Sequence, residues 1–171
     1  MKDSSSTSKH GSKEQCDMHQ MNKYPYYKLF WMLLLSFIAM YLLMYAMVNK
    51  LSNVIPNVNQ FYMAGLMSTP MLIIELLLMK KMYPNKKLNF ALHSVGVIAA
   101  LLFYAGIRNQ AAVTDEQFLK SMIPHHAGAI LMVEQSNLSD REVQQLGRDI
   151  IASQQKEIDF MKAKLRALKN K

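Results

Sequence analysis

Three long apolar blocks, each flanked by charged residues, dominate the middle of the chain. A helix needs about 20 apolar residues, rising about 1.5 Å each, to cross roughly 30 Å of hydrocarbon. The blocks therefore predict transmembrane helices over residues 29–48, 61–79 and 90–107. We expect residues 29–108 to form a membrane domain. Residues 1–28 are polar and have no periodic apolar pattern, which is typical of a disordered tail.

The lysines indicate how the membrane domain is oriented. Lys23 and Lys28 precede the first block, and four lysines lie within residues 80–87, whereas the loop between the first two blocks has only Lys50. Cytoplasmic loops carry the excess of lysine and arginine. We therefore expect a multi-pass protein of the cytoplasmic membrane with a cytoplasmic N-terminus. Because the number of spans is odd, the C-terminal part is expected to be periplasmic or extracellular.

The last third of the chain has the pattern of amphipathic helices outside the membrane. Capping boxes that begin at Thr114 and Ser139 predict helices over residues 115–138 and 140–169. Pro124 lies inside the first helix, where it is expected to cause a kink or a local break. The predicted fold is therefore all-α, with three transmembrane helices followed by a two-helix hairpin.

This hairpin, residues 113–171, is expected to need a partner. Its second helix carries one apolar stripe, which consists of Val143, Leu146, Ile150, Ile158, Met161, Leu165 and Leu168. Two helices of this size bury too little surface to be comfortably stable alone. We therefore predict a homo-oligomer, in which two hairpins pack into a four-helix bundle.

Composition changes this picture mainly through methionine. The formal charge of +8 invites a nucleic-acid interpretation, but the lysines lie beside the apolar blocks and at the chain end, which suits a lipid bilayer better. We expect no nucleic-acid partner. The single cysteine, Cys16, allows no intramolecular disulfide. The 15 methionines are either flexible apolar filler or soft thioether ligands, depending on whether they lie near histidine.

Methionine and histidine do occur together in residues 122–132. Met122, His125 and His126 lie along one side of the predicted helix, although adjacent histidines point about 100° apart and need not reach the same ion. Alternatively, the histidines satisfy backbone carbonyls that Pro124 leaves free, and the methionines are core residues.

The second hairpin helix offers Gln154, Glu157 and Met161 on one face, at spacings of three and four residues. Two facing stripes of imidazole and thioether groups suit copper(I), and silver(I) is expected to compete. Zinc prefers imidazole, thiolate and carboxylate ligands, and the predicted hairpin has no cysteine. Copper, favoured as copper(I), is the metal that this pattern indicates.

The run from Phe118 to Ile130 and the segment from Ile150 to Met161 resemble the domain of unknown function 305 family, whose Met-Ile-Pro-His-His-x-Gly-Ala-Ile core is highly specific. The resemblance implies a ferritin-like helical fold, and the family includes exported proteins that bind copper and support copper resistance. It implies five metal ligands: Met122, His125, His126, Met132 and Met161. Longer members carry two hairpins where this chain has one, so the bundle would have to be intermolecular.

Further methionines lie inside the predicted spans at helical spacing, namely Met40, Met44, Met47, Met63, Met67 and Met71. They resemble the methionine pairs of three-span copper transporters, although ordinary packing or lipid-facing positions explain them as well. The tail adds His10, Cys16 and His19, either a loose group of soft ligands or a coincidence.

These patterns lead to one main hypothesis about function. We expect a membrane-anchored copper-binding protein, not an enzyme, that sequesters or hands over copper on the outer side of the membrane. Its metal ligands would be the five residues that the resemblance implies together with Glu157. The first alternative is a copper transporter with methionine-lined spans. The second is a structural helical interaction module with no obligate metal.

Overall fold

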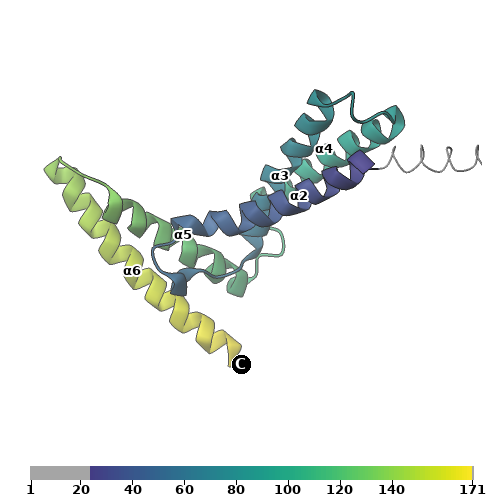
Figure 1. Ribbon diagram of the computed structural model, residues 1–171. Helices are drawn as coiled ribbons and strands as arrows, with labels where there is room; N and C mark the ends of the chain where they lie inside the picture. Colours follow the sequence, from purple (N-terminus) through teal and green to yellow (C-terminus); the bar gives the residue numbers. More distant parts are fainter. Residues whose placement is uncertain (1–23, 171) are drawn as a thin grey trace, which may run out of the picture.

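The structure of the protein is a computed structural model that describes residues 24–170, and over that range it contains helices and no strand (Figure 1). The elements in chain order are α2 (Tyr24–Leu43), the 3₁₀ helices η1 (Met44–Met47) and η2 (Leu51–Asn53), α3 (Val58–Leu78), α4 (Lys86–Arg108), α5 (Asp115–Gln135) and α6 (Arg141–Lys169). The predicted all-α fold is confirmed. The candidate ligands of the N-terminal tail lie outside the described residues.

In the described part of the chain, three helices are long and apolar enough to cross a membrane: Tyr24–Met47, Val58–Leu78 and Lys86–Arg108. They correspond to the three predicted spans, but each begins a few residues earlier than predicted, so residues 24–28, predicted as part of a disordered tail, belong to α2. The starts of α3 and α4 have a local cause. Asn57 accepts a hydrogen bond from the backbone N–H of Gln60 (3.0 Å), and Asn85 caps α4 in the same way through Leu88 (3.1 Å). These polar caps satisfy free N–H groups at the helix starts, so each helix extends beyond its apolar block.

Small residues let the spans approach closely. A Cβ atom built on Gly65 of α3 would lie 2.4 Å from Cζ of Phe103 in α4, and one on Gly106 would lie 3.3 Å from the ring of Tyr62. Aromatic rings of one helix therefore pack directly on the backbone of the other. The outward surfaces of all three helices carry large exposed apolar side chains, as expected for contact with lipid.

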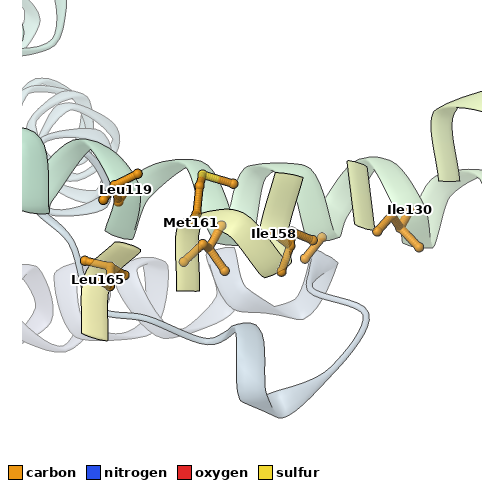
Figure 2. Packing of buried hydrophobic residues seen from close by; sticks show 7 residues of the cluster. Leu119, Ile130, Ile158, Met161 and Leu165 are labelled. Atoms are coloured by element: carbon orange, nitrogen blue, oxygen red, sulfur yellow. The ribbon is translucent and has the colours of Figure 1, made fainter. Parts of the chain in front are cut away.

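Helices α5 and α6 run antiparallel and enclose a continuous apolar core, part of which Figure 2 shows. Its buried members are Leu119, Ile123, Ala127, Ile130, Ile158, Met161 and Leu165. A kink or a local break was predicted at Pro124; the break does not occur, since α5 is helical on both sides of this buried proline. Asp140, rather than Ser139, caps α6, because its Oδ1 accepts hydrogen bonds from the backbone N–H groups of Glu142 (2.9 Å) and Val143 (3.0 Å).

The hairpin lies against the end of the membrane domain that is opposite the lysine-rich α3–α4 loop (Figure 1). We call this end the hairpin end. Val48 and Ile55, from the loop between α2 and α3, pack against the hairpin core. The backbone N–H of Val58 donates a hydrogen bond to Oε1 of Gln117 at 3.2 Å. A single chain therefore supplies part of the cover that the two-helix hairpin needs.

Candidate metal site

The adjacent histidines of α5 face different neighbours. His126 is buried, with 7% of its surface exposed, whereas His125 is exposed. The Nε2 atom of His126 lies 2.6 Å from Oε2 of Glu157 on α6. His125 lines a cavity instead. One turn of α5 thus directs one imidazole toward α6 and the other toward the membrane domain.

The His126–Glu157 contact orients the buried imidazole ring. A carboxylate only accepts hydrogen bonds, so the Nε2–H group of His126 donates a hydrogen bond to Oε2 of Glu157. The Nδ1 atom is buried and has no hydrogen-bond partner among residues 24–170. In the tautomer with its hydrogen on Nε2, the ring carries a lone pair on Nδ1, and histidines that ligate metals through one nitrogen commonly donate their other N–H to a carboxylate.

Met161 belongs to the core rather than to an accessible site. It is 6% exposed and packs among the apolar side chains between α5 and α6 (Figure 2). Its position on the apolar stripe of α6 explains this burial, because residues three and four apart share one helical face. Of the predicted ligands, the structure therefore places His126 of α5 and Glu157 and Met161 of α6 at the interface between these two helices.

The other three predicted ligands lie together on a different side of α5. Met122, His125 and Met132 line a cavity of about 450 Å³ between α5 and the hairpin end of the membrane domain. The opposite wall of this cavity carries Met44 and Met47 of η1 and Met63 of α3. We call this space the junction cavity. It gathers five thioethers and one imidazole.

Sequence reasoning missed the contribution of the membrane domain to this cavity. Helical spacing placed Met44, Met47 and Met63 on the faces of their own helices, but spacing within a helix does not show which other helix that face meets. The available signal was position: these methionines lie near the ends of the predicted spans on the side where the hairpin follows.

The donor set is neutral and soft. Within residues 24–170, no three His, Cys, Asp or Glu side chains form a group that could hold a metal ion. This makes a zinc or di-iron site of the usual composition a poor fit to the described part of the chain. Thioethers with an imidazole are ligands that copper(I) accepts. The residues of the junction cavity therefore fit copper(I) better than a hard divalent ion.

Three helices of membrane-spanning length, followed by a helical hairpin at one end, define the architecture of a multi-pass membrane protein with a domain outside the spans. The family described as "Domain of unknown function (DUF305)" matches residues 104–169. This segment of the chain belongs to the family, which confirms the resemblance found in the sequence.

A similar protein extends the comparison beyond the hairpin. The chain is 37% identical over 145 residues to "Uncharacterized protein L153" of Acanthamoeba polyphaga mimivirus, and the alignment covers 82% of this chain and 93% of that protein. An alignment of this length includes membrane segments as well as the hairpin. No solved structure matches the chain.

Proposed function

We propose that this protein is a membrane-anchored copper-binding protein that sequesters copper(I) or hands it over at the membrane surface. The observation that carries the proposal is the convergence of Met122, His125 and Met132 on the junction cavity. Three soft donors from one helix share one space, instead of being distributed over the core and the surface. The proposal includes no catalytic step.

The His126–Glu157 contact has a supporting role in this proposal. It joins α5 to α6 beside the cavity and so fixes the rotation of α5 about its axis. That rotation directs His125, the next residue along the chain, toward the cavity. His126 is also a second imidazole that could bind the metal, since its Nδ1 atom accepts no hydrogen bond from the described part of the chain.

The proposed location follows from the lysine distribution. The hairpin lies at the end of the membrane domain opposite the lysine-rich loop, and this loop is expected on the cytoplasmic side. Copper would then be bound on the outer side of the membrane.

Self-association of the hairpin is also part of the proposal. Val143 and Leu146, at the start of α6, are 45% and 58% exposed. These two positions of the apolar stripe are not covered by α5 and offer a surface for a second copy.

Copper transport, the first alternative, requires an assembly of several chains. Met63 and Met67 are exposed on the surface of α3, at 37% and 44%. Met63 lines the junction cavity at one end of the membrane domain, but further chains would be needed to cover the exposed face of α3 and form a methionine-lined path.

The test is a titration of the purified full-length protein with copper(I), without oxygen and in competition with a copper(I) chelator. A variant with Met122→Leu, His125→Ala and Met132→Leu is expected to bind roughly tenfold or more weakly, since loss of outer-shell groups alone costs that much at many metal sites. The matched control is Met82→Leu, an exposed methionine in the α3–α4 loop, which should leave binding unchanged. A wild-type protein that takes no copper from the chelator would overturn the proposal.

A further inference from the structure

Three of the five thioethers in the junction cavity come from the membrane domain and not from the hairpin. We propose that the metal site is composite, with Met44, Met47 and Met63 completing the donor set that α5 presents. Copper(I) would then be held at the boundary between the spans and the hairpin. This inference rests on the proposed function and adds to it the ligands supplied by the membrane domain.

The geometry of η1 explains how two of these methionines reach one cavity. The first span changes from an α-helix to a 3₁₀ helix at Met44–Met47, and Val48 is extended. A 3₁₀ helix has about three residues per turn, so side chains at i and i+3 point in the same direction. Met44 and Met47 stand in that relation. The tightened last turn therefore presents both thioethers to the same side.

Helix α5 approaches η1 closely enough for the two sets of donors to share a space. A Cβ atom built on Gly128 would lie 3.5 Å from the carbonyl oxygen of Met47. Gly128 follows His125 by three residues, so both lie on the same face of α5. The contact between Gly128 and Met47 thus fixes the distance across the cavity beside the imidazole.

The side chains that line the cavity favour a monovalent metal ion over a divalent one. None of the described side chains that line it belongs to Asp, Glu, Lys or Arg, and His125 is its one titratable member. A divalent ion in such a site would lose hydration without a carboxylate to compensate, whereas the desolvation penalty of a monovalent ion is smaller. Neutral thioethers and an imidazole therefore suit copper(I) or silver(I).

The composite site is tested by substitution in the full-length protein. One variant replaces Met44, Met47 and Met63 with leucine, which conserves volume and apolar character. Its matched control replaces Met40, Met67 and Met71, methionines of the same two spans that do not line the cavity.

Copper(I) affinity should fall roughly tenfold or more in the first variant and stay unchanged in the control. Wild-type affinity in the first variant, together with weakened binding in the α5 variant described above, would overturn the composite site and leave the proposed function intact. No binding by the wild-type protein would overturn both.

A second measurement reports on individual residues and needs no substitution. Silver(I) shares the soft-donor preference of copper(I) and is used as the probe, and hydrogen peroxide converts accessible thioethers to sulfoxides, which mass spectrometry locates. Silver should protect Met44, Met47 and Met63 from oxidation and leave Met67 and Met82 as reactive as before. Protection limited to the methionines of α5 would overturn the inference.

Discussion

Gly128 provides a sharp test of whether α5 lies against the first span. A Cβ atom at this position would lie 3.5 Å from the carbonyl oxygen of Met47 and 3.9 Å from its Cβ, which are ordinary contact distances. Alanine therefore fits without displacement. Because glycine inside a helix costs about 1 kcal/mol relative to alanine, Gly128→Ala should stabilise the protein by roughly 0.5–1 kcal/mol.

Leucine at the same position adds carbon atoms in the direction of the Met47 backbone. Leucine and alanine have similar helix propensities, so the difference between the two variants isolates the steric effect. Overpacking of this kind costs about 1–3 kcal/mol. Gly128→Leu should therefore be less stable than Gly128→Ala by about that amount, and copper(I) binding should weaken as α5 is displaced from η1.

The assay is thermal unfolding of the full-length variants in one detergent, with copper(I) competition as a second measurement. We expect the highest melting temperature for Gly128→Ala, an intermediate one for the wild type and the lowest for Gly128→Leu. Ala163→Leu, at an exposed position of α6, controls for the general effect of leucine and should be nearly neutral. If Gly128→Leu melts at or above Gly128→Ala, the hairpin does not lie against Met47 as described.

Three further changes test the hairpin and the linker that precedes it. Glu157→Ala leaves the buried His126 with no hydrogen bond to either ring nitrogen, so denaturant unfolding should show a loss of about 1–3 kcal/mol, and an unchanged midpoint would refute the contact. Ile158→Ala removes a side chain that is 0% exposed and should lower the free energy of unfolding by about 2–5 kcal/mol. Its control, Phe160→Ala, changes a position that is 68% exposed and should lower it far less. Equal losses in the two variants would contradict the described core. Ala112→Gly should stabilise the linker by about 1 kcal/mol, because the φ angle of 55° is strained for alanine; a lower melting temperature would contradict that assignment.

Local patterns determined most of the fold. The length of each apolar block sets its ability to span the membrane, and this requires no knowledge of its neighbours. The period of the α6 stripe predicted the burial of Ile158, Met161 and Leu165, which the structure confirms. Val143 and Leu146 belong to the same stripe and yet stay exposed. Periodicity gives the direction of a face, but whether another element covers that face depends on the rest of the molecule.

The candidate site shows the same division. The sequence by itself identified Met122, His125 and Met132 and the roughly 100° between adjacent histidines of a helix. Only the tertiary structure decided that α5 lies between α6 and η1, with His126 toward Glu157 and His125 toward Met47. Residues far apart in the sequence meet because the loop between α2 and α3 packs on the hairpin core. Spacing along one helix cannot encode such contacts, since they arise from the combined packing of several helices.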